Sequence, residues 1–131
     1  MLDVELVSRL KANCPYLTEL GLAGCDLNSA GLCYVAELLR KNSCVTSLDL
    51  TNNNIQDRGI AALVHMLQRN TTIRTVLLGG NCFGDEAIRS LAVVAGEKGI
   101  RISVVPGFIL VDGGDIILQV PNFFCRENFK I

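Results

Sequence analysis

Residues that commonly carry out acid–base or nucleophilic chemistry are scarce in this sequence. His65 is the only histidine, so a Ser-His or Cys-His nucleophile would depend on that one side chain. No pair of carboxylates stands at the end of a predicted strand in an acid/base arrangement. The Gly-Gly pairs at 79–80 and 113–114 lack the Lys-Ser/Thr that completes a phosphate-binding loop. We therefore predict that the chain is not an enzyme and has no catalytic residue, cofactor or small-molecule substrate.

Six cysteines raise two other possibilities, a metal site and disulfide bonds. They stand at positions 14, 25, 33, 44, 82 and 125. No two of them lie two to four residues apart, which is the usual spacing of structural zinc ligands. We therefore predict no metal site, and we expect free thiols, as in a reducing cytosol.

Composition and charge exclude several classes of partner. The 131 residues carry a net charge of −1, which is unlike the basic surface that nucleic acid requires. No stretch reaches the roughly 18–20 apolar residues needed to cross a bilayer, and the first residues lack the pattern of a secretory signal. These features predict a soluble cytoplasmic protein with neither nucleic acid nor membrane as a partner.

The strongest pattern in the sequence is an internal repeat. Residues 17–44, 45–72 and 73–100 align as three segments of 28 residues without insertion or deletion. Apolar positions recur in every copy and include Leu20, Leu48 and Val76; Leu22, Leu50 and Leu78; and Val35, Leu63 and Leu91. Agreement at so many positions predicts three equivalent structural units that stack on one another.

Within each copy, the apolar spacing changes from a strand period to a helix period. Alternation such as Leu48-x-Leu50 predicts a short strand with one buried face, and the later apolar positions predict helices over 29–41, 57–69 and 85–97. Asn53 and Asn81 follow the strands, where their amides could form a hydrogen-bonded ladder. Cys25 takes this position in the first copy, and we interpret it as structural. We expect Asn42 and Asn70 to close the first two helices.

The pattern L-x-x-L-x-L-x-x-N/C-x-L is the leucine-rich-repeat signature, and the 28-residue period resembles the ribonuclease-inhibitor type. That type includes ribonuclease inhibitor, the Ran GTPase-activating proteins and the repeat regions of NOD-like receptors. The segment 14–20 also resembles the repeats of F-box proteins. The resemblance covers residues 17 to about 105. It implies an α/β right-handed solenoid, with parallel inner strands and outer helices, that binds other proteins. The catalytic arginine of the Ran GTPase-activating proteins lies outside the matched portion, so no catalytic residue is carried over.

The two ends of the chain depart from the repeat. Residues 1–16 fit the helical half of an incomplete earlier repeat, with Val4, Val7 and Leu10 in the helix positions. The chain is then either a fragment of a longer array or a protein with a minimal N-terminal cap. Residues 101–131 are expected to hold a fourth strand with Ile102 and Val104 inward, a β-hairpin and a tail. The hairpin is predicted to cap the stack, and a docking segment for another subunit is the alternative.

The remaining candidate site is a surface formed by the strand residues between the inward leucines. We predict that this concave face binds a protein partner, with Leu77 as an apolar anchor. The predicted partner-binding residues are Glu19, Ser47, Asp49, Thr51, Arg74, Thr75 and Leu77. The leading hypothesis is an interaction module of an intracellular sensor, scaffold or adaptor. The alternatives are a structural subunit docked into a complex through its terminal edges and, more remotely, a GTPase-activating protein.

Overall fold

The computed structural model describes residues 3–105, 108–110 and 116–117. Helices and strands alternate along the chain from the first helix to the fourth strand, and two further strands follow. The helices are α1 (Val4–Lys11), α2 (Asn28–Leu39), α3 (Asp57–Arg69) and α4 (Asp85–Lys98). The strands are β1 (Glu19–Gly21), β2 (Ser47–Asp49), β3 (Thr75–Leu77), β4 (Arg101–Val105), β5 (Phe108–Leu110) and β6 (Ile116–Ile117).

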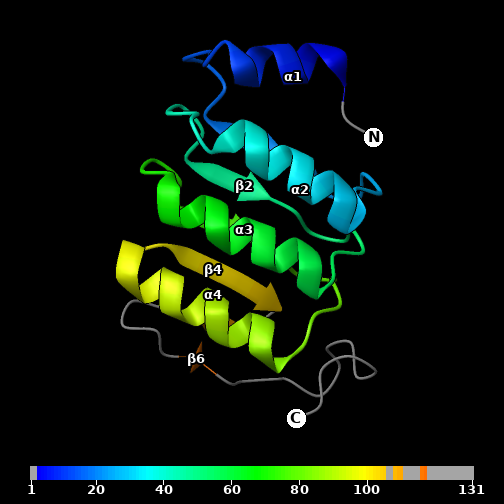
Figure 1. The fold of residues 1–131 in the computed structure, drawn as a ribbon, viewed down its shortest axis with the longest axis vertical. Helices are drawn as coiled ribbons and strands as arrows, with labels where there is room; N and C mark the ends of the chain where they lie inside the picture. Colours follow the sequence, from blue (N-terminus) through cyan, green and yellow to red (C-terminus); the bar gives the residue numbers. More distant parts are fainter. Residues whose placement is uncertain (1–2, 106–107, 111–115, 118–131) are drawn as a thin grey trace.

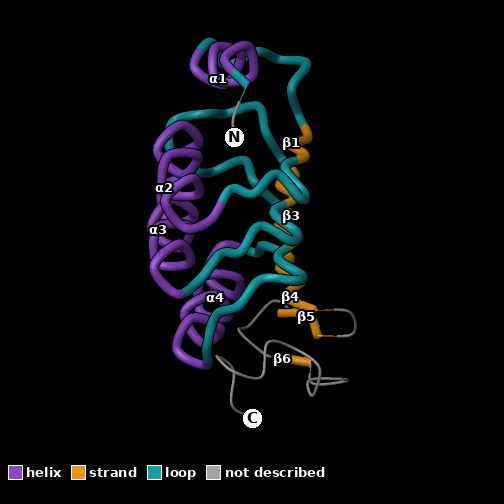
Figure 2. Tube along the Cα trace, turned by 90° about the vertical axis from the view of Figure 1, so that its right-hand side faces the viewer, coloured by secondary structure: helices purple, strands orange, loops and turns teal. Residues whose placement is uncertain are grey.

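The strands β1 to β4 form a parallel sheet in chain order. The helices stack in a second layer that covers one face of this sheet (Figure 1). Seen from the side, the helices and the strands form two separate columns joined by loops (Figure 2). The predicted α/β repeat array is confirmed as four parallel strands that alternate with four helices.

A single apolar core lies between the two layers. It is built mainly from leucine, isoleucine, valine and alanine, and Phe83 is the one fully buried aromatic side chain among the described residues. The repeated positions Leu48, Leu50 and Leu78 are all 0% exposed, as expected for residues at the strand–helix interface of stacked repeats. Ile102 and Val104 of β4 are buried as predicted.

Buried asparagines tie each repeat to the one before it. The Oδ1 atom of Asn53 accepts from the backbone N–H groups of Cys25 and Leu27, both at 3.0 Å, and its Nδ2 donates to Leu22 O at 2.7 Å. Asn81 makes the same contacts one repeat later, accepting from Asn53 N at 2.9 Å and donating to Leu50 O at 2.9 Å. The predicted ladder is therefore confirmed. It satisfies loop backbone groups that neither helix nor sheet reaches.

A second ladder, not predicted as such, runs along the turns that follow the helices. Asn70 Nδ2 donates to Asn42 O at 3.0 Å, while Asn42 Nδ2 donates to Leu10 O at 3.2 Å. Asn70 is the C-cap of α3, as expected. Asn42 is not the corresponding cap, because α2 ends at Leu39 rather than at residue 41. Asn42 instead turns the chain, because its Oδ1 accepts from the backbone N–H groups of Cys44 at 2.9 Å and Val45 at 2.8 Å.

The ends of the stack differ from its middle. Leu10 is the only buried residue of α1, and Val4 is 80% exposed. The expectation that Val4 fills a helix position in the core is therefore wrong, because α1 is short and only its C-terminal end packs closely. Strands β5 and β6 pair antiparallel next to β4, whereas the predicted turn and the tail beyond 117 lie outside the described residues. Capping by this segment stays a prediction.

Candidate functional site

The residues of β1 to β4 that point away from the helices share one surface, which we call the strand face. In each three-residue strand the central side chain is buried and the flanking ones are exposed or half-buried, because successive side chains of a strand point to opposite sides. The strand face consists of Glu19, Gly21, Ser47, Asp49, Thr75, Leu77, Arg101 and Ser103.

The strand register places these residues in two rows that cross the sheet. One row contains Glu19, Ser47, Thr75 and Arg101, and the other contains Gly21, Asp49, Leu77 and Ser103. Five of the seven residues predicted for partner binding are therefore neighbours in these rows. The half-buried Leu77 lies beside Asp49 on one side and Ser103 on the other.

The other two predicted residues, Thr51 and Arg74, lie at the margins of the strand face. Thr51 follows β2, and Asp49 Oδ1 accepts hydrogen bonds from Thr51 N at 3.0 Å and from Thr51 Oγ1 at 2.6 Å. Arg74 precedes β3, and its guanidinium donates to Ile73 O at 3.2 Å. The Asp49 carboxylate thus has a structural role at the end of β2 in addition to its exposure on the strand face.

Arg101 and Ser103 belong to the strand face but were absent from the predicted set. Arg101 pairs with Thr75 and Ser103 with Leu77. The sequence did contain the signal, because inward Ile102 and Val104 require outward neighbours on either side. The 28-residue alignment missed them, since the step from β3 to β4 is two residues shorter than the earlier steps.

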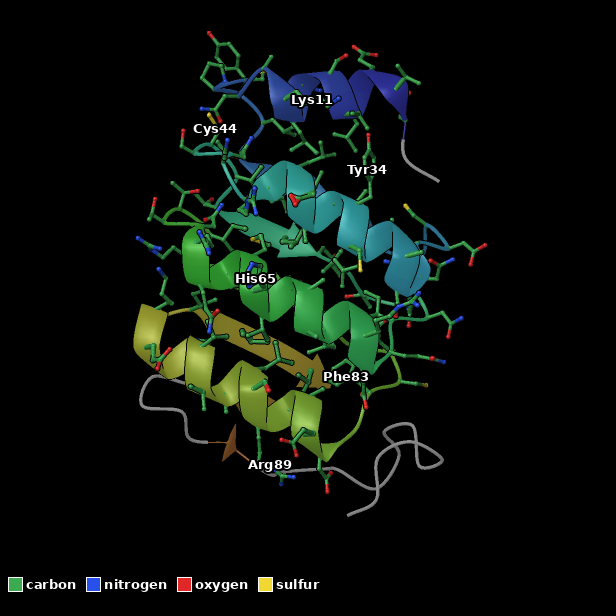
Figure 3. All side chains as sticks on the ribbon, in the orientation of Figure 1. Lys11, Tyr34, Cys44, His65, Phe83 and Arg89 are labelled. Atoms are coloured by element: carbon green, nitrogen blue, oxygen red, sulfur yellow. The ribbon has the colours of Figure 1, made fainter. Side chains whose placement is uncertain are left out.

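Outside the strand face, the described residues offer little that could do chemistry. His65 is exposed on α3, as predicted (Figure 3). Within the described part of the chain, no group of three or more potential metal ligands lies together. None of the described helices combines the length and apolar composition needed to span a bilayer.

The cysteines differ in their surroundings. Cys14, Cys33 and Cys44 are free thiols, whereas Cys82 is disulfide-bonded, so the expectation of free thiols is wrong for Cys82. A backbone hydrogen bond from Tyr16 lowers the pKa of the Cys14 thiol below its ordinary value, and nearby Arg9 acts in the same direction while desolvation opposes them. Cys14 occupies the position of Asn42 one repeat earlier, and its sulfur, like Asn42 Oδ1, has hydrogen bonds with the backbone amides two and three residues later.

An apolar hollow of about 660 Å³ lies between α1 and the start of α2. Its apolar lining is made by Val4, Val7, Leu27, Gly31 and Tyr34, and the polar residues Asp26 and Asn28 complete it. Tyr34 rises from α2 toward α1 (Figure 3) and is 47% exposed. The hollow exists because α1 packs closely only near Leu10, and it lies at the same end of the stack as the free edge of β1.

Comparisons with known proteins support the repeat architecture. The model of the family described as "Leucine Rich repeat" matches residues 13–36, 41–64 and 69–92, which is more than half of the chain. A search of curated proteins finds no significant match.

Two solved structures share the fold. The structure of leiomodin-1 actin-binding site 2 aligns with a TM-score of 0.70 and 23% sequence identity, over 81% of this chain and 65% of that one. The C-terminal domain of tropomodulin from Caenorhabditis elegans aligns with a TM-score of 0.69 and 17% identity, over 79% of this chain and 64% of that one. The chain thus covers slightly less than two thirds of either structure. At these identities the likeness concerns the fold alone, while the three family matches and the stacked strand–helix units agree: the chain belongs to the leucine-rich-repeat family.

Proposed function

We propose that the chain is a non-catalytic protein-interaction module that binds its partner through the strand face. The observation that carries this proposal is the continuity of that face. Four parallel strands in register present their outward side chains as one surface, and the sheet itself already satisfies the backbone groups between them. Side chains such as Ser47, Thr75 and Leu77 are therefore available to a partner on a rigid support.

The first partner to test is actin. The solved structure of leiomodin-1 carries the name of an actin-binding site, and this chain is similar to it over most of its described length. The likeness is one of fold, so it selects a partner for testing and does not identify one. A role in an intracellular scaffold or adaptor is the broader form of the same proposal.

The binding of purified monomeric actin, measured by biolayer interferometry, tests both parts of the proposal. The variant Ser47→Arg/Thr75→Arg places two bulky cations in the middle of the strand face. We expect it to bind at least about tenfold more weakly, which corresponds to a loss of about 1.4 kcal/mol. The matched control, His65→Arg/Ser90→Arg, changes two exposed positions on the outer helices and should bind like the wild type. Equal loss in both variants would contradict the assignment to the strand face, and no binding by the wild type would exclude actin.

A second candidate function is that of a subunit docked into a complex through its N-terminal end. It is favoured by the apolar hollow beside Tyr34 and by β1, whose outer edge has no strand next to it among the described residues. Exposed strand edges readily pair with other chains. Sedimentation equilibrium over a hundredfold range of concentration tests self-docking of this kind, and Tyr34→Glu should abolish any association that uses the hollow. A concentration-independent monomer would contradict self-association through this end.

A further inference from the structure

The charges on the strand face are separated along the stack. Glu19 on β1 and Asp49 on β2 are acidic, β3 contributes only the uncharged Thr75 and Leu77, and Arg101 on β4 is basic. Arg74, at the margin beside β3, adds to the basic half. A partner that crosses the strands therefore meets negative charge at one end, an apolar side chain in the middle and positive charge at the other end.

These charges are available to a partner. Glu19 and Arg101 are exposed, and neither takes part in an ion pair among the described residues. The two ion pairs found there join Glu37 of α2 to its C-cap residue Arg40, and Glu86 to Arg89 on α4, both in the helix layer. Glu19 and Arg101 can therefore form ion pairs with a partner without breaking an ion pair within the protein.

The spacing of the charged residues fits one kind of structure in the partner. Glu19 and Arg101 lie in the same row on the first and fourth strands, so about three strand spacings, roughly 14 Å, separate them. Three turns of an α-helix advance about 16 Å and bring residues about eleven positions apart to the same side. A helix lying across the strands can therefore reach both charges from one face.

We propose that the strand face binds a helical protein segment in a fixed direction. A basic side chain of the segment lies over Glu19, an acidic side chain lies over Arg101, and an apolar side chain contacts Leu77. This inference rests on the proposed function and adds the chemistry and the direction of the bound segment. Charge pairs at the rim of an interface contribute little affinity each, but they fix the register of the partner and suppress the reversed one.

The test uses a synthetic helical peptide with lysine and glutamate eleven positions apart on one face, leucine between them, and a nitroxide spin label beside the lysine. Broadening of backbone amide signals in NMR spectra reports which strand lies near the label. In the wild type, the label should broaden the amides of β1 more than those of β4. In the charge-swapped variant Glu19→Arg/Arg101→Glu, the preference should reverse, while the peptide affinity stays within about twofold.

Two single variants measure how much each ion pair contributes to peptide affinity. Glu19→Gln and Arg101→Gln should each weaken peptide binding about two- to fivefold, as expected for one exposed ion pair. A label that broadens the same strand in the wild type and in the swapped variant would overturn the proposal. Equal broadening of β1 and β4, or the absence of any shift on the strand face, would overturn it as well.

The failure of this inference can be distinguished from the failure of the proposed function. In one outcome, Ser47→Arg/Thr75→Arg weakens the binding of a protein partner while the peptide binds with no preferred orientation. The strand face is then the binding site, but its charges do not set the direction of the bound segment. If the same variant leaves the partner's affinity unchanged, the proposed function fails.

Discussion

Replacing Asn53 by alanine should destabilise the fold far more than the removal of one surface amide. Asn53 is 1% exposed, and its side chain serves the repeat before its own. It accepts from Cys25 N and Leu27 N and donates to Leu22 O. Alanine would leave three backbone groups of the preceding loop without these partners, while the strands and helices around them stay packed.

The magnitude follows from the number of groups left unsatisfied. A buried polar group that loses its partner costs about 1–3 kcal/mol, so three such groups give a loss of at least about 3 kcal/mol in the free energy of unfolding. That is a large share of the roughly 5–15 kcal/mol that keeps a typical domain folded. The effect should appear as a lower urea midpoint.

Urea unfolding followed by circular dichroism at 222 nm measures this loss, because the chain contains no tryptophan to report by fluorescence. Gln68→Ala is the matched control, since it removes the same amide chemistry from an exposed position of α3 and should change stability by less than about 0.5 kcal/mol. If Asn53→Ala lowers the free energy of unfolding by less than about 1 kcal/mol, the ladder does not hold the repeats together.

Three further perturbations test other parts of the structure. Gly80 has φ +74°, and a Cβ there would meet the side chain of Asn52 in the preceding repeat. Gly80→Ala should therefore lower the free energy of unfolding by about 1–2 kcal/mol in the same urea assay. The control Gly21→Ala should be neutral, because nothing lies within 4 Å of the new Cβ. Leu50 is 0% exposed, and Leu50→Ala should lower the free energy of unfolding by about 2–5 kcal/mol; a smaller loss would mean that the core is loosely packed. The backbone amide of Tyr16 is the chief cause of the lowered pKa of Cys14, which gives more thiolate at pH 7.5. Iodoacetamide should therefore modify Cys14 faster in the native protein than in urea. Equal rates in the two conditions would contradict the lowered pKa.

Much of the fold could be predicted because the repeat places the same physical demand on each copy. Leu22, Leu50 and Leu78 face the same interior. Apolar residues at every second position, followed by apolar residues at helical spacing, leave few alternatives for the backbone of each repeat. Helices α3 and α4 differ from their predicted limits by at most one residue. Asn53 and Asn81 could be assigned to a ladder because an amide offers both a donor and acceptors in a buried loop.

The parts that could not be predicted depend on contacts that the repeat does not encode. Val4 has the right spacing for the core, but only the C-terminal end of α1, near Leu10, packs closely on the stack, so Val4 is exposed. Arg101 escaped notice because the last step of the array is two residues shorter. The hydrogen bonds between Asp49 and Thr51 depend on side-chain geometry at the end of β2. The membership of the strand face could therefore be largely predicted from alternation, whereas its charge order required the register.

Site-specific photocrosslinking in cells tests the central claim most directly. A benzophenone amino acid is placed at Ser47 or Thr75 on the strand face, and at His65 on the exposed side of α3 as the control. We predict that Ser47 and Thr75 crosslink to the same protein, identified by mass spectrometry, and that His65 does not. Crosslinking of that protein from His65 alone, or equally from all three positions, would contradict binding through the strand face.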